Sequence, residues 1–443
     1  MEFTTDIECA LALDAADPLR HIRELFLLPP TRVSTSKVEN FLGGTNPGWR
    51  EGEEDGKQVY FLGNSLGLQP KITRLHIDRV LEQWANYGVE GFFHGKDPWM
   101  NYHDQLIQPL SKIVGALPHE VSVMNQLTVN LHLMLASFYM PSGKKRKILC
   151  EQKAFPSDQY TFETYVKHLG MEPEDVILEI APRVGEVIIR LEDIIDTIEQ
   201  HHDEIALVFW GGINYYTGQL FDMASITATA HTHGIRVGFD LAHAAGNVEL
   251  KLHDWDVDFA CWCSYKYLNS GPGAVGGVYI HERFHQDKTL NRLAGWWGYD
   301  KATRFQMKKG FKPMPSAEGW QLSTPSMILY ACHAAALEVF EEAGWENVLE
   351  KQSKLNAYLW YLLNELNNAQ PEQVIQVLTP AQERGSQVSL FMLRDGKKIF
   401  DSLMEQGIIV DWREPNVIRL APVPLYNTFA DVWKFYEAIK KMI

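Results

Sequence analysis

Short apolar segments alternate with helix-like stretches through most of this chain, and this alternation restricts the fold more than any other feature of the sequence. The stretches between the strand-like runs are about 10 to 20 residues long, which is long enough for a crossover helix. Helical periodicity is clearest over Ile72–Tyr87 and Val129–Tyr139. The expected strands are Val121–Asn125, Lys147–Cys150, Ile205–Trp210, Val237–Asp240, Phe259–Tyr265 and Val275–Ile280. The pattern predicts an α/β fold with a mostly parallel sheet covered on both faces.

The last third of the chain has a different order of predicted helices and strands. An amphipathic helix is predicted over Ser326–Ala343, and the later strand-like segments Val388–Leu393 and Val417–Leu420 are separated by helices. We therefore expect a large domain over residues 71–325 and a smaller α/β domain over residues 326–443. Residues 1–70 are expected to form an N-terminal segment that packs with the small domain. The polar, glycine-rich stretch Gly43–Gly56 within it predicts a surface loop.

Composition excludes several classes of protein. The chain has 443 residues, 46% of them hydrophobic, and a net charge of -15. Such a charge argues against nucleic-acid binding, because phosphate contacts need a basic face. The five cysteines show no paired spacing, so neither a disulfide framework nor a metal site is indicated. They are Cys9, Cys150, Cys261, Cys263 and Cys332.

Targeting signals are not evident in the sequence. The first twenty residues are acidic and lack the basic flank and apolar stretch of a signal peptide. No run of about 18 apolar residues occurs, so a membrane span is not expected. These observations predict a cytoplasmic protein.

Two charged residues follow neighbouring predicted strands. Asp240 ends the segment Ile235–Asp240, and Lys266 follows the apolar run that begins at Phe259. Ligands of open α/β sheets bind beyond the carboxyl ends of the strands. Alone, Asp240 is also compatible with a helix N-cap, and Lys266 is more typical of a solvated strand end. Together they match pyridoxal phosphate, which needs a lysine to hold it and a carboxylate to keep its ring nitrogen protonated.

Two further segments provide what that cofactor requires. The turn at Leu127–Thr128 joins a strand to a helix, and Thr128 is well placed as its N-cap. The start of a helix binds phosphate through backbone N–H groups. Phe155 follows the next strand, at the same edge of the sheet, and could stack on the ring. Each feature alone would also suit a simple structural role, as a capped helix or as core packing.

At this point the sequence resembles the kynureninase family of fold-type-I, aspartate-aminotransferase-like enzymes. The motifs that carry the resemblance are Tyr60–Pro70, Gly238–Asn247, Cys261–Asn269 and Arg419–Asn427. The resemblance implies pyridoxal-phosphate-dependent hydrolysis of kynurenine to anthranilate and alanine, in tryptophan catabolism and NAD biosynthesis. It also implies a homodimer whose active site is shared between subunits.

The resemblance also assigns roles to particular residues. Lys266 would carry the cofactor as a Schiff base and shuttle the α-proton, and Tyr265 would donate or accept a proton during cleavage. Asp240 would pair with the ring nitrogen. The implied cofactor-binding residues are Leu127, Thr128, Phe155, Pro156, Ser157, Asp158, Asp240, His243, Tyr265, Lys266, Trp296 and Thr324, with Trp296 coming from the partner subunit. The implied substrate-binding residues are Arg419, which would hold the α-carboxylate, with Asn64, Ser65, Phe92 and Thr324.

Three positions depart from the animal members of the family. Gly211 stands where those enzymes have a serine that contacts the cofactor. Phe92 and Thr324 stand where they have a histidine and an asparagine associated with the 3-hydroxylated substrate. We therefore expect kynurenine to be a better substrate than 3-hydroxykynurenine.

Other functions on the same fold remain alternatives at this stage. A cysteine desulfurase needs a reactive cysteine in the last third of the chain, and the final cysteine is Cys332, inside the predicted helix Ser326–Ala343. An aminotransferase would differ in transferring its amino group to a keto acid. A non-catalytic, cofactor-binding regulator would need a basic DNA-binding module, which the acidic N-terminal segment does not suit.

Overall fold

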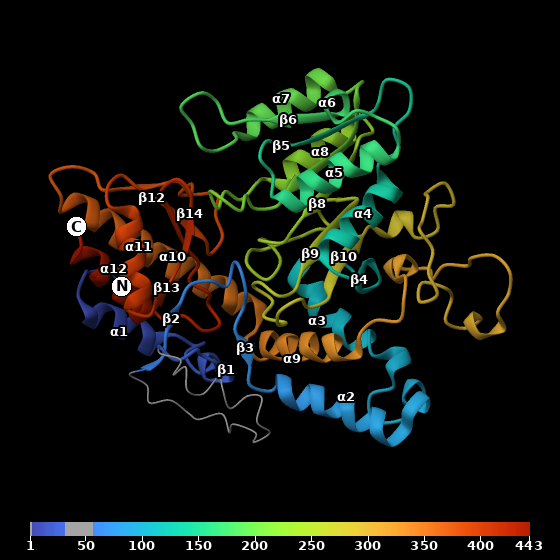
Figure 1. Ribbon diagram of the computed structural model, residues 1–443, viewed down its shortest axis with the longest axis horizontal. Coiled ribbons are helices and arrows are strands. Elements are labelled where there is room, and N and C mark those ends of the chain that lie inside the picture. Colours follow the sequence, from blue (N-terminus) through green and yellow to red (C-terminus); the bar gives the residue numbers. More distant parts are fainter. Residues whose placement is uncertain (1, 32–55) are drawn as a thin grey trace.

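The computed structural model describes residues 2–31 and 56–443 (Figure 1). A seven-stranded sheet, called here the large sheet, forms its centre, and a smaller four-stranded sheet lies beside it with the C-terminus. The strand order of the large sheet is β4-β10-β9-β8-β7-β5-β6. Strand β10 runs antiparallel to β4 and β9, and all other adjacent strands are parallel. The fold is thus the predicted α/β type with a mostly parallel sheet.

Six strands of the large sheet lie close to where the apolar runs predicted them, and the seventh, the edge strand β6, was not predicted. In chain order they are β4 (Val121–Val123), β5 (Lys147–Glu151), β6 (Ile177–Ile180), β7 (Ile205–Gly211), β8 (Arg236–Asp240), β9 (Phe259–Cys263) and β10 (Gly276–Ile280). Their covering helices are α2 (Thr73–Tyr87), α3 (Asp104–Val114), α4 (Leu127–Phe138), α5 (Pro156–His168), α6 (Pro173–Val176), α7 (Leu191–His201), α8 (Met223–Thr232) and α9 (Met327–Ala343). Strand β9 ends at Cys263, so Lys266 lies in the following loop and not at the strand end itself.

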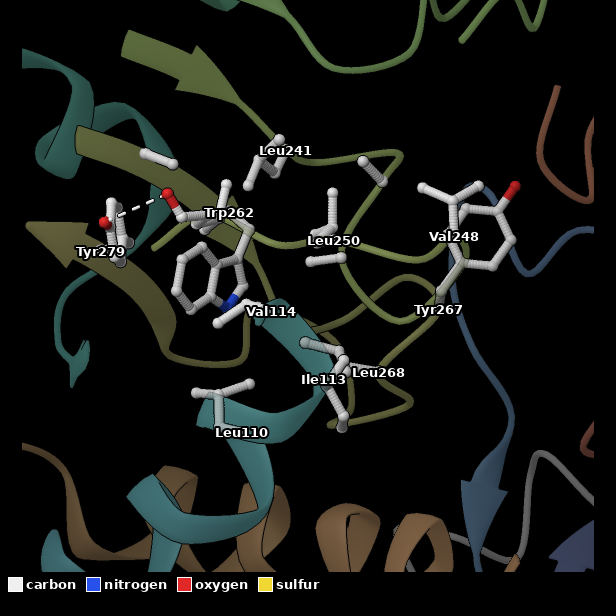
Figure 2. Close-up of a cluster of buried hydrophobic side chains, with 14 of the residues drawn as sticks. Leu110, Ile113, Val114, Leu241, Val248, Leu250, Trp262, Tyr267, Leu268 and Tyr279 are labelled. Carbon is white, nitrogen blue, oxygen red and sulfur yellow. Dashed lines mark hydrogen bonds between the residues drawn. The ribbon is translucent and has the colours of Figure 1, made fainter. Parts of the chain in front are cut away.

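Apolar side chains point from both faces of the large sheet, as a parallel sheet covered on two sides requires. In β9, Ala260 and Trp262 face the core that contains α3 and α9, while Phe259 and Cys261 face the core that contains α4 and α5. Figure 2 shows Trp262 surrounded by aliphatic side chains, Leu110 and Val114 of α3 among them. Alternate side chains of one strand therefore belong to two separate hydrophobic cores.

The small sheet is antiparallel, with strand order β11-β12-β15-β14. Its strands are β11 (Ile375–Val377), β12 (Val388–Met392), β14 (Asp411–Arg413) and β15 (Val417–Leu420), and its helices are α10 (Trp345–Asn368), α11 (Gly396–Glu405) and α12 (Phe429–Lys440). The sequence predicted β12 and β15 to within one residue.

The N-terminal segment contacts elements near both sheets. Helix α1 (Ile7–Ala16) packs against α12, and its Asp14 carboxylate accepts hydrogen bonds from the N–H groups of Phe429 and Ala430 at 2.7 and 3.0 Å. Strand β2 (Val59–Tyr60) pairs with β13 (Ile408–Ile409), and β1 (Phe26–Leu27) pairs with β3 (Gln69–Pro70). Most of the predicted loop Gly43–Gly56 lies outside the described residues.

Helix α9 connects the two sheets and packs with the larger one. Its buried residues Tyr330, Leu337 and Phe340 belong to the same core as α3, and the helix contacts α2 and α3. The division into an N-terminal segment (residues 1–70), a large domain (71–325) and a small domain (326–443) remains a proposal. In this proposal α9 is the connecting helix. Within residues 2–31 and 56–443, no helix has both the length and the apolar character needed to cross a membrane.

Candidate active site

The carboxyl ends of β5, β7 and β8 and the loop after β9 surround a cavity of about 180 Å³. Because these strands are parallel, their last residues meet at one edge of the large sheet. Nine sequence-predicted residues line the cavity: Leu127, Thr128, Phe155, Ser157, Asp158, Asp240, His243, Tyr265 and Lys266. Six other residues complete its wall: Gln126, Glu151, Gly211, Ile213, Tyr215 and Ala242.

Lys266 is buried in this cavity, with 8% of its surface exposed. Its Nζ atom lies 3.0 Å from Nε2 of His243 and 5.7 Å from the centre of the Phe155 ring. The carbonyl of Lys266 accepts a hydrogen bond from the N–H of Asn269, and Gly67 N–H donates to the Tyr265 carbonyl at 2.8 Å. These backbone bonds hold the loop so that the lysine side chain enters the cavity.

His243 is neutral in this setting. Burial lowers its pKa well below the usual value, and the positive charge of Lys266 lowers the pKa further. A neutral imidazole can accept a proton of the lysine amine through Nε2. Its Nδ1 atom is buried and has no protein partner among the described residues. This nitrogen is therefore available to a polar group bound in the cavity.

Two aspartates share the bottom of the cavity. The Asp240 carboxylate accepts a hydrogen bond from Ala242 N–H at 2.7 Å, and Asp158 contacts it. Burial raises the pKa of Asp158 well above its usual value, and the charge of Asp240 raises it further. Burial also raises the pKa of Asp240, while the nearby Lys266 charge opposes the increase. We assign the proton to Asp158 and the negative charge to Asp240, which faces the lysine.

The first turns of α4 and α5 both line the cavity. Neither helix has a side-chain cap, so first-turn N–H groups of α4 are free for an anion. In α5 Pro156 has no N–H and the Asp158 N–H donates to the Phe155 carbonyl at 2.9 Å, which leaves the N–H of Ser157. The prediction of Thr128 as N-cap is wrong: Gln126 occupies that position, because the helix begins at Leu127. Thr128 instead lies within the first turn and lines the cavity. The two helix starts suit a phosphate group.

The aromatic neighbours of the cavity are Phe155 and Tyr265. Phe155, the N-cap residue of α5, is 41% exposed and meets the Tyr215 ring edge-on at 5.2 Å. One ring face therefore stays available for stacking. Burial raises the pKa of the Tyr265 phenol, as does its contact with Cys263. Tyr265 is consequently a neutral hydrogen-bond donor in the free site.

Arg419 does not line the cavity and is held by protein groups. The residue is 1% exposed, its Nε donates to Asp411 Oδ2 at 2.8 Å, and its Nη2 contacts the same oxygen. Its Nη1 donates to the Tyr215 carbonyl. Asn64 is also buried and donates to Gln387 at 2.9 Å. Two other predicted residues do not line the cavity either. They are Ser65, next to Asn64, and Pro156, the first residue of α5.

Three further predicted residues lie away from the cavity of their own chain. Phe92 packs against Trp99 and Trp297, with ring centres 5.2 and 6.0 Å apart. Trp296 is 42% exposed, and Thr324 is exposed. The structure of one chain therefore does not bring these residues together with Lys266.

Sequence reasoning missed Glu151, a buried carboxylate of the cavity wall. Its Oε2 accepts a hydrogen bond from Asn214 Nδ2 at 2.8 Å. Burial raises its pKa from 4.5 to about 7. A signal for this residue was present, because Glu151 ends an apolar strand just before the segment that contains Phe155.

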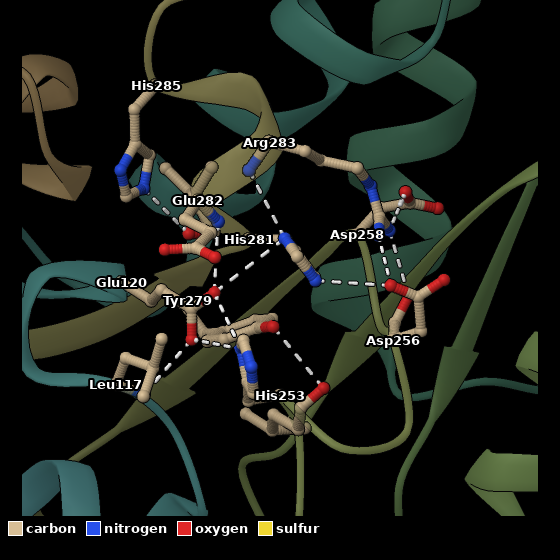
Figure 3. Close-up of polar contacts among 12 residues, drawn as sticks. Leu117, Glu120, His253, Asp256, Asp258, Tyr279, His281, Glu282, Arg283 and His285 are labelled. Atoms are coloured by element: carbon tan, nitrogen blue, oxygen red, sulfur yellow. Dashed lines mark hydrogen bonds and ion pairs between the residues drawn. The ribbon is translucent and has the colours of Figure 1, made fainter.

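A second polar cluster surrounds the buried Glu120 (Figure 3). Potential metal-ligand atoms of Glu120, His253 and His281 lie within 4.8 Å of one another. However, the carboxylate already accepts hydrogen bonds from the N–H groups of Leu117 and Glu282 at 3.0 and 2.9 Å. His253 Nδ1 lies 3.0 Å from it. These bonds satisfy the buried charge, so we assign the cluster a structural role.

The cavity residues fit pyridoxal phosphate on three counts. A buried lysine amine can carry the aldehyde, Asp240 provides a carboxylate for the ring nitrogen, and two helix starts can hold the phosphate. The unpaired Nδ1 of His243 is a further polar atom that a bound cofactor would cover. The fold and the cavity together define a pyridoxal-phosphate enzyme of the aspartate-aminotransferase-like fold type I.

Comparison with solved structures agrees with this fold. The fold resembles the cystine C–S lyase C-DES in complex with cysteine persulfide, with 18% identity, a TM-score of 0.71, and coverage of 87% of this chain and 97% of that one. It also resembles the cysteine desulfurase of Thermococcus onnurineus NA1, with 17% identity, a TM-score of 0.71 and coverage of 87% and 94%. At such low identity these likenesses show the fold alone.

Full-length relatives identify the family. The chain is 49% identical to the kynureninase of Flavobacterium johnsoniae over 100% of this chain and 99% of that protein. It is 47% identical to the kynureninase of Myxococcus xanthus, over 97% and 96%. The model of the kynureninase C-terminal domain matches residues 348–439. The chain belongs to the kynureninase family.

Proposed function

We propose that this chain hydrolyses L-kynurenine to anthranilate and L-alanine with pyridoxal phosphate bound to Lys266. The observation that carries the proposal is the 49% identity to a curated kynureninase across the whole chain. The cavity supports it, because Lys266 and Asp240 are buried there and the first turns of α4 and α5 line it. When bound, the cofactor supplies an electron sink that stabilises negative charge at the substrate's α-carbon.

Several residues hold the cofactor in this proposal. Asp240 pairs with the ring nitrogen, Phe155 covers a ring face, and the first turns of α4 and α5 bind the phosphate. Ser157 and Asp158 contribute to cofactor binding from the first turn of α5. Pro156 is the first residue of that helix, and its ring fixes the backbone φ angle there. The partner subunit would add Trp296, and Thr324 would also contact the cofactor.

Other residues bind the substrate and move protons. The Lys266 amine removes the α-proton and returns it before alanine leaves, and the neutral His243 lies 3.0 Å away to share its proton. The neutral Tyr265 phenol donates a proton during carbon–carbon cleavage. Arg419 binds the α-carboxylate through the guanidinium N–H groups that Asp411 leaves free. Asn64 and Ser65 cover the α-carboxylate end of the bound substrate.

Kynurenine is the preferred substrate over 3-hydroxykynurenine in this proposal. Phe92 offers no hydrogen-bond partner to a ring hydroxyl, and its packing against Trp99 and Trp297 leaves it apolar. Thr324 is a shorter side chain than asparagine. A kcat/KM for the hydroxylated compound equal to or above that for kynurenine would contradict this preference.

We further propose a homodimer in the cytoplasm, acting in tryptophan catabolism and NAD biosynthesis. An exposed aromatic cluster supports dimerisation: Phe305 contacts Phe93 at 5.8 Å and Trp296 at 5.9 Å between ring centres. All three side chains are between 42 and 54% exposed. Exposed apolar patches of this kind typically mark protein–protein contacts.

The deciding experiment incubates the purified protein and pyridoxal phosphate with kynurenine, 3-hydroxykynurenine or cysteine. We expect anthranilate fluorescence and equimolar alanine from kynurenine. Release of alanine from cysteine without anthranilate from kynurenine would support a desulfurase instead. The structure disfavours that alternative, because Cys332 lies within helix α9 and burial raises the pKa of its thiol.

A further inference from the structure

The turn at Asn214–Gly218, which follows β7 of the large sheet, docks onto the small sheet through three successive carbonyls. The Tyr215 carbonyl accepts from Arg419 and, at 2.9 Å, from Gln387. The Tyr216 carbonyl accepts from Ser389 Oγ at 2.6 Å. The Thr217 carbonyl accepts from Thr379 Oγ1 at 2.5 Å. The backbone of one short turn therefore accepts hydrogen bonds from four buried residues, two in strands of the small sheet and two in the connection between β11 and β12.

One side chain shapes this turn. Asn214 Oδ1 accepts from the N–H groups of Tyr216 and Thr217 at 3.0 and 2.8 Å, and from the Thr217 hydroxyl at 3.1 Å. Its Nδ2 donates to Glu151 Oε2 at 2.8 Å. Asn214 thus uses both ends of its amide, with the oxygen directed to the turn and the nitrogen to the cavity wall.

Gly211 lies directly beside the carboxyl group of Glu151. A Cβ atom added at Gly211 would lie 2.8 Å from Glu151 Oε1, which is closer than such atoms approach. Gly211 and Glu151 end neighbouring strands, β7 and β5. The absence of a side chain at 211 therefore lets a buried carboxyl occupy that part of the wall.

These contacts form a continuous path from the cavity to Arg419. We propose that Glu151 and Asn214 are positioning residues that hold the Tyr215 carbonyl, and through it the Arg419 guanidinium, in the orientation that binds the substrate's α-carboxylate. The inference rests on the proposed function, which gives Arg419 that role. Neither residue needs to touch the reacting atoms, so their effect falls on carboxylate binding more than on turnover.

The test compares variants of the cofactor-loaded enzyme by kcat, KM for kynurenine and the dissociation constant of L-alanine measured by calorimetry. N214A should raise KM and the alanine dissociation constant about tenfold, since one or two buried hydrogen bonds are lost, and should change kcat less than threefold. E151A should act in the same direction. E151Q keeps an acceptor oxygen for Asn214 and should restore nearly wild-type values.

A double-variant cycle tests the path itself. If Glu151 acts through Asn214, E151A combined with N214A should be no worse than N214A alone. The matched control is N367A in α10, because Asn367 also uses both ends of its amide, accepting from Ile375 N–H at 3.1 Å and donating to the Ile375 carbonyl at 2.8 Å. N367A should lower Tm without changing KM or alanine binding.

Different failures have different meanings. If N214A lowers Tm as N367A does but leaves alanine binding unchanged, while R419K weakens it, the positioning role is wrong and the role of Arg419 stands. If R419K leaves alanine binding unchanged, both the carboxylate role and the inference fail. A wild-type enzyme that releases no anthranilate from kynurenine would instead contradict the proposed function.

Discussion

Replacing Glu151 with glutamine should make thermal stability less dependent on pH. Burial raises the pKa of this carboxyl from 4.5 to about 7, the Asn214 hydrogen bond lowers it, and the charge of Asp240 raises it. The folded chain therefore keeps a proton that the unfolded chain releases between pH 4.5 and 7. Because the folded state binds more protons, its stability falls as pH rises through that window.

The size of this effect follows from the raised pKa. A change from 4.5 to about 7 corresponds to about 3 kcal/mol of stability lost between low and high pH. Unfolding entropies near 2 cal/mol/K per residue give roughly 0.9 kcal/mol per degree for a chain of 443 residues. The wild-type Tm should therefore fall by about 3 °C relative to E151Q, which has no proton to lose at this position.

The assay is thermal unfolding of the cofactor-free protein from pH 5 to 8.5, since the cofactor would add charges of its own. E8Q is the control, because Glu8 lies exposed on α1 and its replacement changes charge without changing burial. The Tm difference between E8Q and wild type should stay nearly constant. A similarly constant difference for E151Q would refute the reasoning, because Glu151 would then keep one protonation state throughout.

Three further changes test the proposed site. K266A should reduce anthranilate release at least about a thousandfold, because the nucleophile and proton carrier are lost together, and should remove the absorbance band of the lysine-bound cofactor; a retained band would place the linkage elsewhere. D411N leaves the buried Arg419 without its charged partner, so we expect KM for kynurenine to rise about tenfold and Tm to fall. An unchanged KM would show that carboxylate binding does not depend on that pair. W296A should weaken cofactor binding about tenfold in equilibrium dialysis if the partner subunit supplies this indole. Equal affinity in the variant would argue against a shared site.

Sequence patterns were most informative where a buried strand ends in a charged residue. Strand β8 was predicted to within one residue, and Asp240 and Lys266 do share a cavity. All five residues of β9 are buried, but residues 133–138 of helix α4 are also buried without a break. The alternation of strand-like and helix-like segments, and not the apolar run alone, therefore predicted this strand. Parallel neighbours then bring their carboxyl ends to one edge, so two residues 26 positions apart become neighbours by topology alone.

Contacts between the two sheets were beyond such reasoning. Arg419 could be read as a carboxylate binder, but its pairing with Asp411 depends on the antiparallel register that sets these two residues opposite each other in β14 and β15. Thr128 was misplaced as a cap because Leu127 at the first helical position and Gln126 before it are weak sequence signals for a helix start. Phe92, Trp296 and Thr324 lie outside the cavity of their own chain, and no local pattern reveals that.

Glu151 also ends a buried strand, but its sequence did not mark it as a site residue. A carboxylate after an apolar strand has the same local sequence whether it faces solvent or a cavity, and the solvated alternative is the common one. Here the deciding residues lie about sixty positions further along, where Gly211 leaves space and Asn214 donates a hydrogen bond. Their placement follows from β5 and β7 lying side by side in the large sheet. A strand-end carboxylate therefore becomes a site candidate when an adjacent parallel strand ends in glycine followed within a few residues by an amide side chain, a pairing that could be searched for once strand order is known.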